Sequence, residues 1–138
     1  MTSSHSQNAL KHPMESANYA QKIYNNNFSD MGSQKYSDLV GEPINTIDDL
    51  SQALKNGKIS ASEIPVEYIN RDGNILILNT RTSQALTQAD IPRSQWHILD
   101  RTGDPLQEAL LDGQLSRNKL SSSGTPTVRK SGGTKRGK

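Results

Sequence analysis

The strongest constraint on the fold is a pair of strand-like runs joined by Asp72-Gly73. The sequence IPVEYI lies before this pair, and ILIL lies shortly after it. Asp-Gly is typical of a two-residue hairpin turn, because both central positions of that turn require a positive φ. Residues 75–78 are all apolar, which predicts a strand that is buried on both faces. We therefore expect an antiparallel hairpin at the centre of the domain.

Helical patterns flank this hairpin. Before it, Thr46 is placed to cap a helix, and Gly57 fits the left-handed position that follows a helix. After it, apolar residues at helical spacing follow Asn79, and they do so again after Pro105. A short strand is expected around Trp96, whose ring we expect in the core. The fold class is thus a small single α+β domain, a β-hairpin with flanking helices.

Composition divides the chain into three predicted parts. We expect a flexible or weakly helical leader over residues 1–39, an α+β domain over 40–115 and a disordered basic tail over 116–138. Within the first part, 16–28 could form a short helix, and 29–43 is predicted to be a loop. Apolar residues make up only 31% of the chain, so the core must be small. The tail holds no acidic residue, and its basic residues are Arg117, Lys119, Arg129, Lys130, Lys135, Arg136 and Lys138.

Several classes of protein are excluded by what the sequence lacks. No apolar run approaches the roughly 18 residues of a membrane span, and the first fifteen residues lack the apolar stretch of a signal peptide. The chain has no cysteine, which excludes disulfides and thiolate chemistry. His5, His12 and His97 do not have metal-motif spacing, and no P-loop or G-x-S-x-G motif occurs. We expect no membrane partner, no metal and no cofactor.

A candidate phosphate site lies where the hairpin's second strand meets the next helix. This junction carries Asn79, Thr80, Arg81 and Thr82. The first N–H groups of a helix have no partner within the helix, and its positive dipole end attracts anions. Arg81 could add a bidentate contact, and the Thr82 hydroxyl could add a donor. The alternative is that a threonine caps the helix and Arg81 is a solvated charge.

Candidate catalytic residues follow in the next strand and turn. Phosphodiester cleavage needs groups that move protons and positive charge on the phosphoryl oxygens. His97 has the ordinary pKa for acid–base work near neutrality, although it could be a simple strand residue. Arg101 and Asp104 place a cation and a carboxylate in one turn, although Asp104 could instead cap the helix that follows. We predict His97, Arg101 and Asp104 as the catalytic set.

The segment ISASEIPVEYINRDGNILILNTRTSQALTQADIP resembles the ParB/sulfiredoxin-like superfamily over about 34 of the 138 residues. In that superfamily a polar motif ending in Arg opens a helix and holds the phosphate of a nucleotide or nucleic acid. Asn79, Thr80 and Arg81 match this motif. The sequence departs from the pattern at Asp90, where members usually carry Gly. The resemblance implies a ParB/sulfiredoxin-like central segment, while the absence of cysteine excludes sulfiredoxin activity.

A broader likeness covers residues 64–129, which look like the C-terminal toxin modules of bacterial polymorphic toxins of the contact-dependent growth inhibition and Rhs types. Many such modules are nucleases. The resemblance therefore implies an enzyme of bacterial competition that cleaves phosphodiester bonds in RNA or DNA, as a hydrolase or as a transesterifying RNase.

The toxin likeness also implies a setting. Nucleic acid would be the substrate and a cognate immunity protein a partner. A larger secreted carrier would deliver the module, which would act in the cytoplasm of the target or producing bacterial cell. Two alternatives stay open: a non-catalytic nucleic-acid or nucleotide-binding module that uses the same phosphate site and basic tail, and an interaction protein without chemistry.

Overall fold

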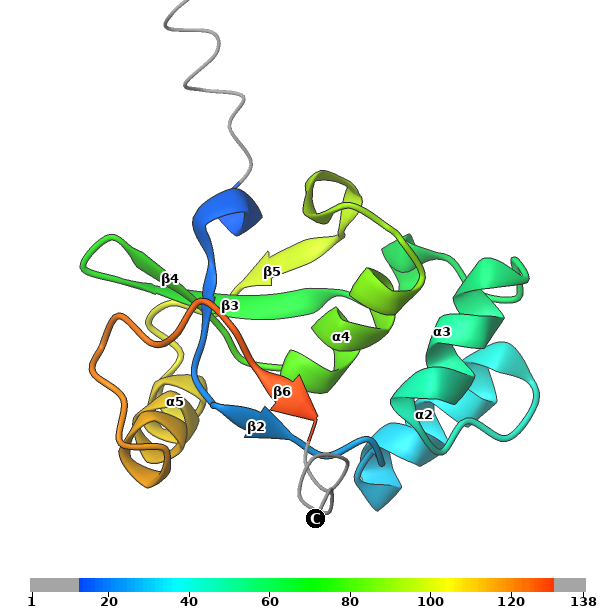
Figure 1. Ribbon diagram of the computed structural model, residues 1–138, viewed down its shortest axis with the longest axis horizontal. Coiled ribbons are helices and arrows are strands. Elements are labelled where there is room, and N and C mark those ends of the chain that lie inside the picture. The colour runs from blue at the N-terminus through cyan, green and yellow to red at the C-terminus, as the bar shows by residue number, and fades with distance from the viewer. Residues whose placement is uncertain (1–12, 131–138) are drawn as a thin grey trace, which may run out of the picture.

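The structure is a computed structural model that describes residues 13–130 (Figure 1). A sheet lies at the centre of this part of the chain, with helices on both of its sides. In chain order the elements are η1 (Pro13–Ser16), β1 (Asn18–Tyr19), β2 (Ile23–Tyr24), α2 (Asp30–Val40), α3 (Ile47–Lys55), η2 (Ala61–Glu63), β3 (Val66–Arg71), β4 (Asn74–Ile77), α4 (Thr80–Gln88), η3 (Arg93–Gln95), β5 (Ile98–Asp100), α5 (Pro105–Arg117) and β6 (Arg129–Lys130). The mixed α and β content of one small domain agrees with the predicted α+β class.

The central sheet of the described residues has four strands in the order β1-β4-β3-β5. β3 and β4 pair antiparallel, whereas β1 pairs parallel with β4 and β5 pairs parallel with β3. Asp72 and Gly73 join the hairpin with φ values of 55° and 90°. The predicted hairpin is therefore confirmed, and its turn has the positive φ values that favour this residue pair. A separate pair of short strands, β2 and β6, runs parallel.

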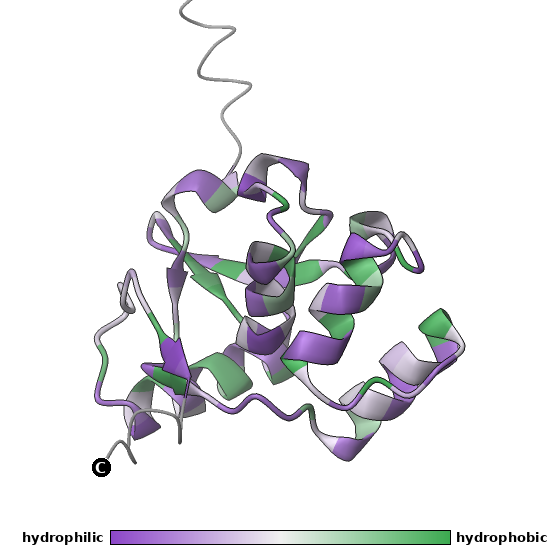
Figure 2. Cartoon of the chain, turned by 45° about the vertical axis from the view of Figure 1, so that its right-hand side comes forward, coloured by the Kyte–Doolittle hydropathy of each residue, from purple (hydrophilic) through white to green (hydrophobic). Residues whose placement is uncertain are grey.

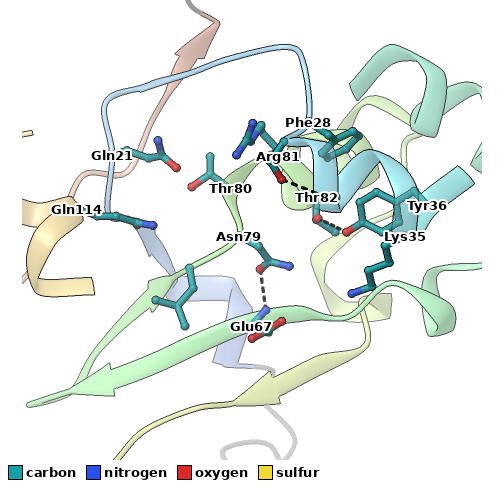
Figure 3. Close-up of a pocket in the computed structure, with 13 residues that line it drawn as sticks. Gln21, Phe28, Lys35, Tyr36, Glu67, Asn79, Thr80, Arg81, Thr82 and Gln114 are labelled. Carbon is teal, nitrogen blue, oxygen red and sulfur yellow. Dashed lines mark hydrogen bonds between the residues drawn. The ribbon is translucent and has the colours of Figure 1, made fainter. Parts of the chain in front are cut away.

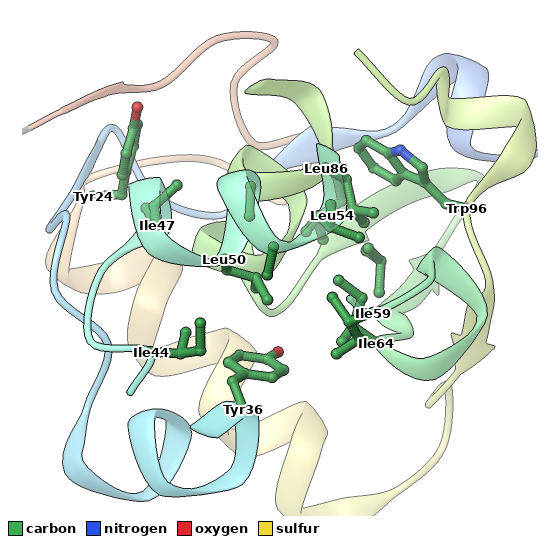
Figure 4. Packing of buried hydrophobic residues seen from close by; sticks show 14 of the residues in the cluster. Tyr24, Tyr36, Ile44, Ile47, Leu50, Leu54, Ile59, Ile64, Leu86 and Trp96 are labelled. Carbon is green, nitrogen blue, oxygen red and sulfur yellow. The ribbon is translucent and has the colours of Figure 1, made fainter. Parts of the chain in front are cut away.

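The central hairpin is packed on both faces. Leu76 belongs to one apolar cluster with residues of α5, and its neighbour Ile77 belongs to a second cluster with residues of α3 and α4. Successive side chains of a strand point to opposite faces, so β4 supplies both clusters. Figure 4 shows the second and larger cluster, in which Trp96 is 4% exposed. The predictions of a doubly buried strand and a buried tryptophan are confirmed.

Helix α3 begins and ends where its local chemistry predicts. The Thr46 hydroxyl accepts a hydrogen bond from the N–H of Asp49, whose carboxylate accepts one from Thr46 in return. Gly57 follows α3 with a φ of 75°. Figure 2 shows that α3 and α4 carry hydrophilic and hydrophobic segments on different sides. Helix α5 continues through Gly113 to Arg117.

Two local predictions for the N-terminal third are wrong. The expected helix over 16–28 is extended chain, in which β1 joins the edge of the central sheet and β2 pairs with β6. The expected loop over 29–43 contains helix α2, which Ser29 caps and Gly41 ends at a φ of 85°. In both cases burial decided the conformation, because Tyr19 and Tyr36 pack into the core.

The packed body is also wider than the predicted 40–115. Met14 and Tyr24 lie in the main core cluster together with Tyr19 and Tyr36. Beyond residue 115, Thr125 exchanges two backbone hydrogen bonds with Tyr19, at N···O distances of 2.7 and 2.9 Å. The prediction of disorder is therefore wrong for 116–130. The rest of the predicted tail and residues 1–12 of the leader lie outside the described residues. No helix within residues 13–130 is long and apolar enough to cross a membrane.

Candidate phosphate site

A cavity of about 290 Å³ lies at the N-terminus of α4 (Figure 3). Its wall comes from five parts of the chain: the β1–β2 connection, the loop before α2 with α2 itself, strand β3, the β4–α4 junction, and α5. Its lining residues are Gln21, Phe28, Ser29, Gly32, Lys35, Tyr36, Glu67, Leu78, Asn79, Thr80, Arg81, Thr82 and Gln114. The four predicted phosphate-binding residues, Asn79 to Thr82, are thus together in one cavity wall.

Asn79 occupies the capping position of α4 without capping it. Its side-chain Oδ1 accepts a hydrogen bond from the N–H of Glu67 at 2.8 Å, and its Nδ2 donates to the carbonyl of Pro65 at 3.0 Å. The Asn79 amide therefore fastens the start of β3 to the helix. Among the described residues no side chain caps α4, so the N–H groups of its first turn have no side-chain acceptor there.

Thr80 is the first residue of α4 and is 1% exposed. Its Oγ1 is buried and has no hydrogen-bond partner among the described residues. The Oε1 of Gln114, which also lines the cavity, is buried and unpartnered in the same way. Figure 3 shows the two side chains extending toward a common space. A buried polar group without a partner costs about 1–3 kcal/mol, so both groups would gain from a ligand's hydrogen bonds.

The other two predicted residues already have partners. The Thr82 hydroxyl lies 2.5 Å from the hydroxyl of Tyr36, and this pair is buried. Burial raises the pKa of Tyr36, and the bond to Thr82 opposes that rise. Arg81 donates from Nη1 to the carbonyl of Asn27 at 2.6 Å, and no partner of its Nη2 or Nε is found among the described residues. The Thr82 hydroxyl is therefore engaged with Tyr36, whereas Arg81 keeps donors without a partner among the described residues.

Lys35 adds a second cation to the lining. Its Nζ lies 5.6 Å from the centroid of the Tyr36 ring, a distance at which an ammonium is attracted to the ring face. Lys35 and Arg81 come from different helices and bring positive charge to the same cavity.

Glu67 is a lining residue that the sequence did not single out. It lies on β3, and its Oε1 accepts a hydrogen bond from Nε of Arg101 at 3.0 Å. No hydrogen bond to its other oxygen, Oε2, is found among the described residues. In the sequence Glu67 is one polar residue of an alternating strand, which is typical of a solvated face. Only the packing of α2 and α5 around β3 turns that face into a cavity wall.

The predicted catalytic residues are spread over three environments. Arg101 does not line the cavity itself, but its side chain donates a hydrogen bond to Glu67, which does. His97 is exposed before β5, does not line the cavity, and accepts from Val66 N–H through its backbone carbonyl at 2.9 Å. Asp104 caps α5, since its Oδ1 accepts from the N–H groups of Leu106 and Gln107 at 3.0 and 3.2 Å. The alternative of a helix cap is therefore confirmed for Asp104.

The cavity can bind an anion on its α4 side and accept a proton on its β3 side. Within residues 13–130, no group of three or more His, Cys, Asp or Glu residues is arranged to hold a metal ion, and His5 and His12 lie outside this range. Comparison with known proteins adds no assignment, because the chain matches no family model, no curated protein and no solved structure.

Proposed function

We propose that this chain is a toxin-type nuclease that binds a phosphate of RNA or DNA at the N-terminus of α4 and cleaves the phosphodiester bond. The observation that carries the proposal is the state of Thr80. Its hydroxyl is buried without a partner at the start of an uncapped helix, in a cavity that Arg81 and Lys35 also line. Unsatisfied donors, a helix dipole and two cations together favour a phosphate over a neutral ligand.

The same groups are suited to the chemistry of cleavage. Negative charge builds up on the phosphoryl oxygens in the transition state, and donors that are already in place stabilise it without reorganisation. The first-turn N–H groups and the free donors of Arg81 would do this. Lys35 would compensate further charge from the opposite wall.

Two features of the central segment support its likeness to the ParB/sulfiredoxin-like superfamily. A hairpin leads into a polar motif that opens a helix, in the order that the likeness implies. Asp90, which stands where members carry Gly, has a φ of 62°. This left-handed conformation is the one that glycine adopts most readily, so the backbone keeps the pattern even though the residue departs from it.

The toxin setting rests on the sequence likeness of residues 64–129. In this setting the module acts on nucleic acid inside a bacterial cell after delivery by a larger carrier, and a cognate immunity protein protects the producer. A second candidate function is a non-catalytic nucleic-acid or nucleotide-binding module. It is favoured by one observation: His97 and Asp104 do not line the cavity, so the acid–base set expected from the sequence is not assembled there.

The test is a cleavage assay with the purified full chain on total bacterial RNA and on plasmid DNA, alongside induced expression in cells. The nuclease proposal expects degradation of at least one polymer and arrested growth. Binding of nucleic acid without cleavage, measured on the same samples by fluorescence anisotropy, would instead establish the binding module. Absence of both cleavage and binding would refute the phosphate site as a nucleic-acid site.

A further inference from the structure

We infer that Glu67 is the general base of this nuclease and that its substrate is RNA, whose 2′-hydroxyl Glu67 deprotonates. This inference rests on the proposed function and deepens it. It starts from the hydrogen-bonding groups that the cavity leaves unsatisfied, which are of two opposite kinds.

The first kind is donors. The Thr80 hydroxyl, the first-turn N–H groups of α4 and the free N–H groups of Arg81 all seek acceptors, which phosphate oxygens provide. The second kind is acceptors. Glu67 Oε2 has no hydrogen bond among the described residues, and Gln114 Oε1 is buried without a partner. A phosphodiester carries no proton to give to these acceptors, so a ligand that serves both kinds of group carries a hydroxyl beside its phosphate.

RNA has such a hydroxyl at every nucleotide. Its 2′-hydroxyl lies on the ribose carbon next to the one that carries the 3′-phosphate, and it both donates and accepts hydrogen bonds. DNA has no group at that place. A cavity that is lined by phosphate-binding donors on α4 and by a carboxylate on β3 therefore fits an RNA backbone better than a DNA backbone.

The position of Glu67 also needs an explanation on electrostatic grounds. A carboxylate near a phosphate repels it, which weakens binding unless the carboxylate is neutralised or is used in the reaction. Arg101 compensates the charge by holding Oε1, and no hydrogen bond to Oε2 is found among the described residues. The titratable and charged groups that line the cavity together with Glu67 are Lys35 and Tyr36 of α2 and Arg81 of α4. Among the described residues Glu67 is the only acidic side chain that lines this cavity.

The reaction is then an internal transesterification. Glu67 removes the proton of the 2′-hydroxyl, and the 2′-oxygen attacks the neighbouring phosphorus. The bond between phosphorus and the 5′-oxygen of the next nucleotide breaks, and that oxygen takes a proton from water, which regains one from Glu67. The products are a 2′,3′-cyclic phosphate and a free 5′-hydroxyl, so no external reactant is consumed. In this scheme Glu67 is a catalytic residue, and Arg101 is a positioning residue that orients its carboxylate.

The experiment compares three oligonucleotides of one sequence with the wild-type full chain: all-RNA, RNA with one 2′-deoxynucleotide at the cleavage site, and all-DNA. We expect cleavage of the first alone, with cyclic phosphate and 5′-hydroxyl ends identified by mass spectrometry. This arm needs no variant, so it holds even where a substitution disturbs folding.

The second arm tests Glu67→Gln on the all-RNA substrate, with Glu15→Gln as the matched control. Glu15 is exposed on η1, so Glu15→Gln makes the same carboxylate-to-amide change outside the cavity. Loss of a general base lowers a rate by about 10²- to 10⁴-fold, so we expect Glu67→Gln to lose at least about 100-fold while Glu15→Gln cleaves like the wild type. Thermal melts monitored by circular dichroism verify that both variants fold.

The outcomes separate the two proposals. A wild-type chain that cleaves neither RNA nor DNA refutes the proposed function, and this inference falls with it. Cleavage of DNA or of the 2′-deoxy substrate, or a folded Glu67→Gln variant within about threefold of the wild-type rate, overturns the inference alone and leaves the nuclease standing. Should Glu67→Gln not fold, the 2′-deoxy arm decides whether the substrate is RNA, and Glu67→Ala replaces Glu67→Gln as the test of the general base.

Discussion

Two strand-to-helix junctions in this domain look alike in the sequence and differ in the structure. The junction between β4 and α4 and the one between β5 and α5 each place polar and charged residues at a helix N-terminus. At the second junction, nearby residues accept the hydrogen bonds of the first N–H groups of the helix. Asp104 caps α5, and Thr102 donates to Asp100 from its backbone at 2.8 Å. At the first junction the capping residue turns its side chain away to β3, and the helix opens on a cavity.

The pKa values of the acidic groups show the same difference. Hydrogen bonds from Thr102 lower the pKa of Asp100, and hydrogen bonds from Gly103 and Arg71 lower the pKa of Glu108. At the β5–α5 junction, carboxylates of the chain itself therefore accept hydrogen bonds from the nearby donor groups. The first turn of α4 contains no acidic residue, so no carboxylate of that turn accepts hydrogen bonds from its N–H groups. A helix N-terminus becomes a candidate site when the chain leaves its donors unsatisfied.

The largest expected effect is at the open junction. Arg81→Ala should lower the cleavage rate by roughly thirtyfold to nearly a thousandfold, which corresponds to about 2–4 kcal/mol of transition-state stabilisation. Arg81→Lys keeps the charge but loses the planar set of donors, so it should restore only part of the rate. Initial rates on the cleaved substrate measure both.

Arg81 also holds the carbonyl of Asn27, so its variants need a check of folding by circular dichroism. Lys55→Ala removes an exposed cation outside the cavity and serves as the control. A folded Arg81→Ala variant with full activity would show that the open junction does not bind the reacting phosphate.

The next largest effect is expected for Thr80, where one substitution should lower substrate affinity without lowering the free energy of unfolding. Thr80→Val keeps the shape of the side chain but removes a buried hydroxyl that has no partner among residues 13–130. The free energy of unfolding should stay the same or rise by up to about 1–3 kcal/mol, while affinity for the substrate falls. Thermal melts and anisotropy titrations measure the two quantities.

Thr82→Val is the matched comparison on the same helix. It breaks the buried contact with Tyr36, so we expect it to destabilise the fold by about 0.5–1.5 kcal/mol. Destabilisation by Thr80→Val of equal size would mean that the Thr80 hydroxyl serves the fold and not a ligand.

The smallest effect is expected at the closed junction. Asp104→Ala removes the cap of α5 and should lower the free energy of unfolding by about 0.5–2 kcal/mol, with the cleavage rate unchanged. Urea denaturation and the same cleavage assay test this. A large loss of activity in a folded Asp104→Ala protein would return Asp104 to the catalytic set and remove the distinction between the two junctions.

The sequence by itself determined the features that depend on residues close together in the chain. Asp72-Gly73 predicted the hairpin, Thr46 predicted the start of α3, and the polar run from Asn79 predicted the start of α4. Each of these rests on hydrogen bonds or backbone angles within about one turn. Such signals are present in the local sequence whatever the rest of the chain does.

Tertiary structure decided the rest. The segment around Tyr19 became a strand because it joins the edge of the sheet formed by β4, and Thr125, far along the chain, pairs with it. The cavity itself joins Lys35 of α2, Glu67 of β3 and Gln114 of α5 around the start of α4. No local pattern marks these residues as neighbours, because only the packing of helices on both faces of the sheet brings them together. For the same reason the sequence could propose Asp104 for catalysis, and only the folded helix showed that its carboxylate is used as a cap.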